Sequence, residues 1–222
     1  MPPDPAAFVR AHTVLAAPPL VPEIRLHLAT EVTPLWQATE ATLAATGLPP
    51  PYWAFAWAGG QGLARHVLDH PLLVRGRRVI DVGAGSGLGA IAAARAGAQH
   101  VTALEIDPFA VAAIALNAAA NRVAVVTAAA DAAAYAEPAD VVLVGDMCYE
   151  RALAARLVTW LAGRAASGAL VLLGDPGRAY LPRVGLAECA RYTVPTSREL
   201  EDRDSREAVV WRLSADASPL PP

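Results

Sequence analysis

Three carboxylates stand where predicted buried strands end, and their type and spacing suggest chemistry. Asp81 lies in the apolar run at residues 79–82, Glu105 follows the run at 101–104, and Asp146 follows the run at 140–144. Ligands of open parallel sheets bind beyond the carboxyl ends of the strands, so we expect the three side chains to converge. We also expect the Asp81 carboxylate to face the ligand. Such a pocket attracts an ammonium or sulfonium and repels a pyrophosphate.

A glycine-rich turn follows the first of these strands. Gly83, Gly85 and Gly87 precede a predicted helix at 88–94, and Glu105 stands 24 residues after Asp81, the offset at which a carboxylate binds ribose hydroxyls. With no Arg or Lys between positions 78 and 95 to neutralise a phosphate, the implied ligand is S-adenosylmethionine. The turn resembles the first motif of class I methyltransferases. The alternatives are a dinucleotide site, beginning one turn late at Gly85, and a turn without a ligand.

An aromatic segment precedes the glycine turn. Four of the thirteen aromatic residues fall within positions 52–57. We interpret the segment as a lid in which Trp57 packs beside the adenosyl group and Gly59 and Gly60 give backbone access. The alternative is a helix cap in the core. Asp131, after the third strand, either meets the adenine amino group or is a surface carboxylate.

The third strand-end carboxylate suggests the reaction. Methyl transfer needs a neutral nucleophile held in line with the methyl group, and a lysine amine with a reference pKa of about 10.4 must first lose a proton. Asp146 can attract and orient such an amine, and Tyr149 can hydrogen-bond beside it. The alternative role for Asp146 is a helix N-cap, and the two roles are compatible.

Strands alternate with helices, which predicts an α/β doubly wound parallel sheet of the Rossmann type. We expect a third strand at 123–126 and an antiparallel edge hairpin from strands at 190–195 and 208–213. Residues 1–22 should form a loosely packed lead, a short helix should close at Gly47, and Trp160 should lie in the core. The predicted organisation is an N-terminal extension at 1–50, a methyltransferase domain at 51–215 and a disordered tail at 216–222.

Composition narrows the class of protein. The 222 residues carry a net charge of −3, and all 18 basic residues are arginines without a basic cluster, which argues against a nucleic-acid partner. No apolar run reaches the length of a membrane span, so we expect no membrane partner. The two cysteines and five histidines form no grouping with metal-ligand spacing, so we expect no metal.

Motifs outside the glycine turn extend the resemblance. Residues 146–149 resemble the Asp-x-x-Tyr signature of the seven-β-strand protein lysine methyltransferases. The stretches at 51–54, 57–61, 74–76, 107–108, 116–117, 121–122, 145–147 and 174–178 together resemble the electron transfer flavoprotein β-subunit lysine methyltransferase family, over about residues 23–213. The resemblance implies a seven-stranded class I methyltransferase fold and methylation of lysines of the flavoprotein β subunit. Without an Arg-rich presequence, we expect a monomeric homologue in the bacterial cytoplasm.

The predicted site follows from the residues and the resemblance together. The predicted catalytic residues are Asp146 and Tyr149. The predicted cofactor-binding residues are Trp57, Gly60, Asp81, Gly83, Ala84, Gly85, Glu105, Asp131 and Asp146. Two alternative functions are a ribosomal-protein lysine methyltransferase and a non-catalytic S-adenosylmethionine-binding protein. A separate N-terminal substrate domain usually accompanies the former, and 75 residues before the glycine strand leave little room for one.

Overall fold

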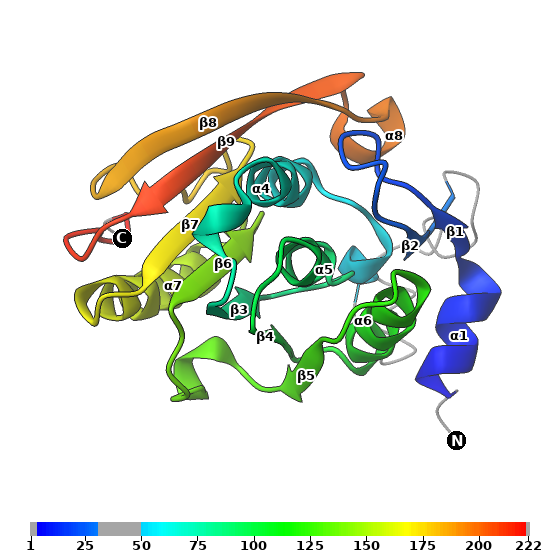
Figure 1. Ribbon diagram of the computed structural model, residues 1–222. Helices are drawn as coiled ribbons and strands as arrows, with labels where there is room; N and C mark the ends of the chain where they lie inside the picture. The colour runs from blue at the N-terminus through cyan, green and yellow to red at the C-terminus, as the bar shows by residue number, and fades with distance from the viewer. Residues whose placement is uncertain (1–3, 31–49, 221–222) are drawn as a thin grey trace.

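A computed structural model describes residues 4–30 and 50–220 of the chain. In this part of the chain, seven strands form one sheet in the order β5-β4-β3-β6-β7-β9-β8 (Figure 1). The strands are β3 (Arg78–Val82), β4 (His100–Glu105), β5 (Val126–Ala129), β6 (Val141–Gly145), β7 (Leu170–Asp175), β8 (Leu186–Pro195) and β9 (Ser205–Leu213). The first five are parallel, whereas β9 pairs antiparallel with both β7 and β8. The predicted doubly wound sheet and its edge hairpin are confirmed.

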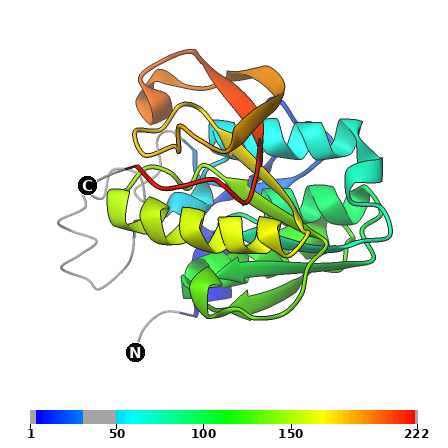
Figure 2. The same ribbon diagram turned by 90° about the vertical axis from the view of Figure 1, so that its left-hand side faces the viewer.

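Helices cover both faces of the sheet (Figures 1 and 2). One face carries α4 (Ala58–Asp69), α5 (Leu88–Arg95) and α6 (Pro108–Ala120), and the other carries α7 (Arg151–Ala166). Side chains alternate along each strand, so Val79 packs under α4 and α5 while Ile80 packs under α7. Shorter elements are η1 (Tyr52–Ala54), η2 (Pro71–Leu73), η3 (Ala132–Ala134) and α8 (Arg198–Glu201).

The N-terminal segment packs against the sheet domain, contrary to the predicted loose lead. It forms α1 (Pro5–His12) and an antiparallel pair of β1 (Val14–Ala16) and β2 (Leu26–Leu28). Val9 and Val21 are fully buried, and the His27 backbone N–H donates to Asn117 of α6 at 2.7 Å. Burial of these apolar side chains outweighs the proline content that suggested loose packing. The predicted helix closing at Gly47 lies outside the described residues.

Two other boundaries also differ from the sequence predictions. The third strand begins at Val126, because its pairing with β4 places Ala129 opposite Glu105. The valines at 123 and 125 instead connect α6 to the sheet and pack against the core. Near the C-terminus, Ala217 is only 7% exposed, so the predicted disordered tail is packed as far as this residue. Asp107 is the N-cap of α6 and accepts the Phe109 N–H at 2.8 Å, and Pro108 opens the helix.

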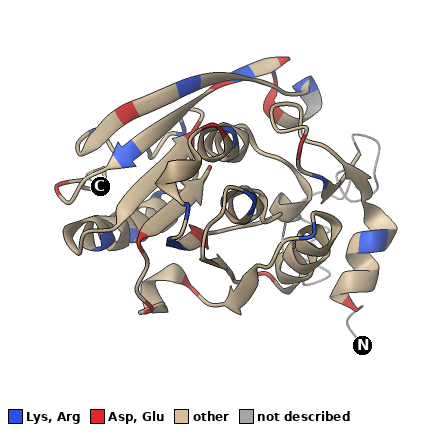
Figure 3. Ribbon diagram, in the orientation of Figure 1, with Lys and Arg blue, Asp and Glu red and all other residues tan. Residues whose placement is uncertain are grey.

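The described helices include none that is both long and apolar enough to span a bilayer. Acidic and basic residues are interspersed over the elements visible in Figure 3.

Candidate active site

The carboxyl ends of the parallel strands open into a cavity of about 670 Å³. Its walls come from the glycine turn after β3, the end of β4, the turn after β5, the loop after β6, η1 and α7. The predicted site residues that line it are Trp57, Gly83, Gly85, Glu105, Asp131, Asp146 and Tyr149. Gly60, Asp81 and Ala84 do not line it. The structure therefore brings most of the predicted residues to one place.

The glycine turn bends at the floor of this cavity. Gly83, Gly85 and Gly87 have φ values of +60°, +51° and +79°, in the left-handed region that suits glycine. A Cβ on Gly83 would also lie 2.5 Å from the sulfur of Met147. Ala84, between these glycines, turns toward the core and donates its N–H to the Leu104 carbonyl at 3.2 Å. The turn therefore presents backbone rather than side chains to the cavity.

Asp81 lies beneath the turn, and this corrects the expectation that its carboxylate faces the ligand. The side chain is 3% exposed and accepts the Ala90 backbone N–H at 2.7 Å. Strand alternation directs it toward α5, where the first-turn N–H groups lack helical partners. Burial raises the pKa of Asp81 to about 7, against the lowering effect of the Ala90 N–H, and Glu105 adds to the increase. Asp81 positions the turn, and Glu105 is the carboxylate that meets the cavity.

The buried Asp81 should make stability depend on pH. The folded protein holds a proton on this carboxyl between pH of about 4 and 7 that the unfolded chain has released, so the unfolding free energy declines as pH rises through that window. Asp81→Asn keeps an acceptor for the Ala90 N–H but cannot ionise. We expect its stability relative to wild type to increase by about 2 kcal/mol between pH 5.5 and 8, measured by denaturant unfolding.

The matched control for this prediction is Asp140→Asn. Arg78 holds the pKa of this exposed carboxyl at about 2, below the tested range. The stability difference between Asp140→Asn and wild type should therefore stay constant from pH 5.5 to 8. A constant difference for Asp81→Asn as well would contradict the assigned pKa.

Glu105 closes the cavity on the side of the glycine turn. One carboxylate oxygen accepts the Gly85 N–H at 2.9 Å, and the other accepts the Ile106 and Asp107 N–H groups at 2.7 and 3.2 Å. Each oxygen has two lone pairs, so the oxygen that accepts only the Gly85 N–H retains acceptor capacity for a ligand hydroxyl. The next residue, Ile106, is 73% exposed and lines the cavity, an apolar surface suited to a flat base. Sequence reasoning missed Ile106, although its place directly after the strand-end carboxylate is a usable signal.

The far end of the cavity lies between η3 and α7. Asp131 caps η3 by accepting the Ala133 N–H at 2.9 Å, and its other oxygen lies 3.7 Å from Arg156. Asp131 is therefore both a loop carboxylate and a cavity residue. Trp160 of α7 was assigned to the core, but it also lines the cavity opposite the alanines of η3. The guanidinium of Arg164 lies over its ring, 4.5 Å from the centroid.

Asp146 lies at the end of the cavity away from η3. The residue is 7% exposed, with a left-handed φ of +61° that aspartate tolerates better than most side chains. One carboxylate oxygen accepts the Gly59 N–H in the first turn of α4 at 2.9 Å, and the other accepts Nε of Arg178 at 2.5 Å. The alternative N-cap role is wrong, because Asp146 instead binds an N–H of a helix 87 residues earlier in the chain, whose N-cap residue is Trp57. Glu150 caps the helix that follows.

Glycines allow α4 to approach Asp146. A Cβ on Gly59 would overlap the Gly174 carbonyl oxygen, and a Cβ on Gly145 would lie 2.9 Å from Cα of Gly60. Gly60 therefore packs its backbone against Gly145 and is absent from the cavity lining. We expect Gly59→Ala to lower the unfolding free energy by about 2 kcal/mol or more through this overlap with backbone.

The control for Gly59→Ala is the next residue. A Cβ on Gly60 meets nothing within 4 Å, and alanine favours a helix over glycine by about 1 kcal/mol. Gly60→Ala should therefore be neutral or stabilising in the same denaturant unfolding measurement. Equal stability for the two variants would contradict the close packing of α4 on the ends of β6 and β7.

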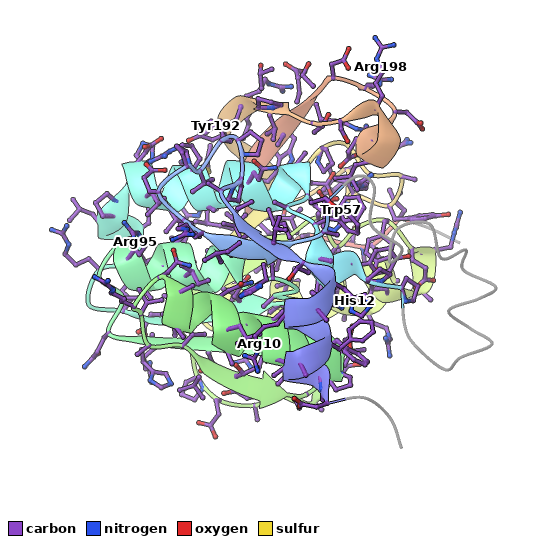
Figure 4. The ribbon with its side chains drawn as sticks, turned by 90° about the vertical axis from the view of Figure 1, so that its right-hand side faces the viewer. Arg10, His12, Trp57, Arg95, Tyr192 and Arg198 are labelled. Atoms are coloured by element: carbon purple, nitrogen blue, oxygen red, sulfur yellow. The ribbon has the colours of Figure 1, made fainter. Side chains whose placement is uncertain are left out.

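Aromatic rings form the mouth beside Asp146. The ring of Tyr52 lies 5.7 Å from that of Tyr149 and 6.2 Å from that of Trp57, and Trp57 Nε1 donates to the Tyr52 carbonyl at 2.9 Å. Figure 4 shows Trp57 between η1 and α8. Burial, followed by the nearby Tyr52 and carboxylates, raises the pKa of Tyr149, so its hydroxyl remains a donor at neutral pH. An aromatic mouth that carries a phenol hydroxyl beside a buried carboxylate suits an aliphatic amine.

The polar and apolar groups that line the cavity fit a nucleoside that carries a positive charge. Glu105 offers an acceptor for a ribose hydroxyl, Ile106 offers an apolar surface for a base, and Gly85 lines the cavity beside them. The four acidic residues that line the cavity outnumber its two arginines, which favours a sulfonium over a pyrophosphate; they are Glu105, Asp107, Asp131 and Asp146 against Arg156 and Arg178. S-Adenosylmethionine meets these requirements.

Comparisons with known proteins identify relatives of this chain. Residues 66–146 match the family model of ribosomal protein L11 methyltransferase. The electron transfer flavoprotein β-subunit lysine methyltransferase of Xenopus laevis is 39% identical over 214 residues, covering 93% of this chain and 86% of the relative. The same enzyme of Danio rerio is 38% identical over 202 residues, covering 88% and 77%.

A solved structure is similar in fold. Magnesium protoporphyrin IX methyltransferase from Synechocystis PCC 6803 with bound S-adenosylmethionine superposes with a TM-score of 0.53 at 21% identity, covering 70% of this chain and 80% of that one.

Proposed function

Because the chain belongs to the electron transfer flavoprotein β-subunit lysine methyltransferase family, we propose that it methylates lysine side chains of that flavoprotein subunit. It is a class I, S-adenosylmethionine-dependent protein-lysine methyltransferase. The identity of more than a third over nine-tenths of the chain supports the choice of substrate. The observation that carries the proposal is the mouth of the cavity, where the rings of Tyr52, Trp57 and Tyr149 lie beside the buried Asp146 carboxylate.

We assign the cofactor to the half of the cavity built on β3, β4 and β5. Glu105 would hold the ribose, Ile106 and Ala132 would face the adenine, and Asp131 would meet its amino group. The backbone of Gly83 and Gly85 would lie along the methionine part. Asp81 supports this arrangement from beneath by fixing the first turn of α5. When bound, S-adenosylmethionine supplies the electrophilic methyl group.

We assign the lysine to the half built on Asp146, Tyr149 and Trp57. The aromatic rings would pack along the aliphatic part of the side chain and exclude water from the reacting atoms. The oxygen of Asp146 that faces Arg178 would accept a hydrogen bond from the amine and aim its lone pair at the methyl carbon. Tyr149, protonated at neutral pH, would hydrogen-bond at the same nitrogen.

A ribosomal-protein substrate is the second candidate. The L11 methyltransferase match ends at residue 146 and contains the glycine turn and Glu105, which we assign to the cofactor. It includes neither Tyr149 nor Arg178 at the acceptor mouth. The match therefore supports the shared cofactor chemistry but does not reach the acceptor mouth. The flavoprotein is the preferred substrate because the resemblance to its methyltransferases covers most of the chain.

A competition assay separates the two substrates. Purified electron transfer flavoprotein and ribosomal protein L11 from one bacterium would be mixed in equal amounts with the enzyme and methyl-labelled S-adenosylmethionine. We expect label in the flavoprotein β subunit at least about 100-fold above that in L11, since a mismatched acceptor loses several kcal/mol of binding. Label predominantly in L11 would replace the proposed substrate. Label in neither protein would reject both.

A further inference from the structure

Arg178 places a permanent positive charge on the carboxylate that we assign to the acceptor. Its Nε donates to Asp146 at 2.5 Å, and the two side chains are 20% and 6% exposed. Asp175 fixes the turn that carries Arg178 by accepting the backbone N–H groups of Gly177 and Arg178, both at 2.7 Å. Arg178 also lines the cavity. The charge is therefore held at the place where the lysine amine would bind.

A second carboxylate holds Arg178 from the opposite side. Glu201 of α8, with a side chain only 1% exposed, accepts Nη2 of Arg178 at 3.2 Å and Nε of Arg206 at 3.0 Å. The ring of Trp57 lies 5.8 Å from the Arg178 guanidinium carbon. Four alternating charges thus run from β9 through α8 to the end of β6. This arrangement leaves Arg178 little freedom to leave Asp146.

An unpaired buried carboxylate would work against methyl transfer. It would stabilise a lysine ammonium and raise the pKa of the amine above its reference of about 10.4, whereas only the neutral amine has the lone pair for attack. A carboxylate about 4 Å from the amine would raise the amine pKa by about 3 units, or roughly 4 kcal/mol, at an effective dielectric constant of 20. A guanidinium at a similar distance offsets this contribution. The pairing with Arg178 therefore removes the extra stabilisation of the ammonium that Asp146 alone would provide.

We propose that Arg178 controls the protonation state of the acceptor lysine. By pairing with Asp146 it disfavours a lysine ammonium at this position and favours the neutral amine. The inference rests on the proposed lysine methylation. The lysine ammonium first loses a proton, which leaves through the mouth to solvent. Asp146 then accepts a hydrogen bond from the neutral amine. Arg178 acts through charge and is a positioning residue.

Other charged and titratable groups surround this pair. They are Asp175 from β7, Glu201 from α8, Arg206 from β9, Cys148 and Tyr149 from the loop after β6, Tyr52 from η1 and Glu105 from β4. Burial raises the pKa of Asp175 to about 6, so this carboxyl is ionised above pH 7. Burial raises the pKa of Cys148 and of Tyr149, which keeps both neutral at physiological pH.

The test is the pH profile of kcat, which reports ionisations in the enzyme–substrate complex. With purified flavoprotein at saturation between pH 6.5 and 9.5, Arg178→Gln should shift the acid limb upward by one unit or more. Its rate would thus be about 10-fold or more below wild type at pH 7, with recovery toward pH 9.5. Arg178→Lys keeps the charge and should restore most of the limb.

Arg206→Gln is the matched control, because it also removes a guanidinium from Glu201 but lies one carboxylate further from the acceptor. It should leave the acid limb in place. An acid limb of the kcat profile that does not move in Arg178→Gln, or that moves equally in Arg206→Gln, overturns the inference. Activity of the wild-type enzyme in the same experiment leaves the proposed function standing.

If the wild-type enzyme does not methylate the flavoprotein, the proposed substrate is rejected. A binding measurement that needs no protein substrate then tests the inference about Arg178. Binding of n-butylamine, a lysine side-chain mimic, to enzyme with S-adenosylhomocysteine should strengthen in wild type from pH 7 to 9.5, as neutral amine accumulates. The increase should be smaller in Arg178→Gln, which also accepts the ammonium. The same pH dependence in both proteins would overturn the inference.

Discussion

Asp146→Asn is expected to lower kcat for lysine methylation about 100-fold or more, with little change in affinity for S-adenosylhomocysteine. Asparagine keeps an oxygen for the Gly59 N–H, so the first turn of α4 should keep this hydrogen bond. It loses the negative charge that pairs with Arg178 and that orients the amine. Removal of one preorganised group at a reaction centre costs 10²–10³ in kcat, which sets the expected magnitude. Single-turnover rates and calorimetry measure the two quantities.

The control for Asp146→Asn is Asp131→Asn, at the other end of the cavity. Asp131 lines the same cavity but lies on the side assigned to adenine, so its kcat should stay within about 3-fold of wild type. An Asp146→Asn enzyme with wild-type kcat would rule out the acceptor role. Parallel losses of kcat and cofactor affinity would instead assign Asp146 to the cofactor.

Glu105→Gln is expected to weaken S-adenosylhomocysteine binding by about 100-fold. A carboxylate that accepts a ribose hydroxyl contributes a charge-assisted hydrogen bond of about 1.5–3 kcal/mol, and an amide replaces one acceptor oxygen with a donor. The new NH₂ group would also oppose the backbone N–H groups of Gly85 or of Ile106 and Asp107. Calorimetric titration of the variant against wild type measures the loss.

Two control measurements accompany the titration of Glu105→Gln. Asp131→Asn should weaken binding by no more than about 10-fold, the effect of one hydrogen bond. Unfolding of Glu105→Gln without ligand shows whether the glycine turn has lost stability. Wild-type affinity in a folded Glu105→Gln protein would contradict the assignment of the ribose to Glu105.

The positions of the parallel strands along the chain and the cavity at their carboxyl ends could be predicted because they follow from local pattern. Apolar runs alternating with helices identified the parallel strands, and the carboxylates at their ends converge because those ends share one edge. The third strand was misplaced by three residues because valines favour strands wherever they occur, whereas the pairing with β4 decides which residues enter the sheet.

Side-chain direction and distant contacts could not be predicted in this way. Asp81 looked like a ligand group, but strand alternation turns it beneath the glycine turn. The link from Asp146 through Arg178 to Glu201 joins residues 32 and 23 positions apart, which only the folded sheet brings together. Trp160 and the N-terminal segment also gained roles from neighbours that periodicity does not reveal.

The most direct test is intact-mass spectrometry of purified electron transfer flavoprotein after incubation with this enzyme and S-adenosylmethionine. The account predicts that the β subunit gains mass in whole methyl steps, that peptide mapping places them on lysine side chains, and that Asp146→Asn produces almost none. An unchanged β subunit, or methyl groups on residues other than lysine, would contradict it.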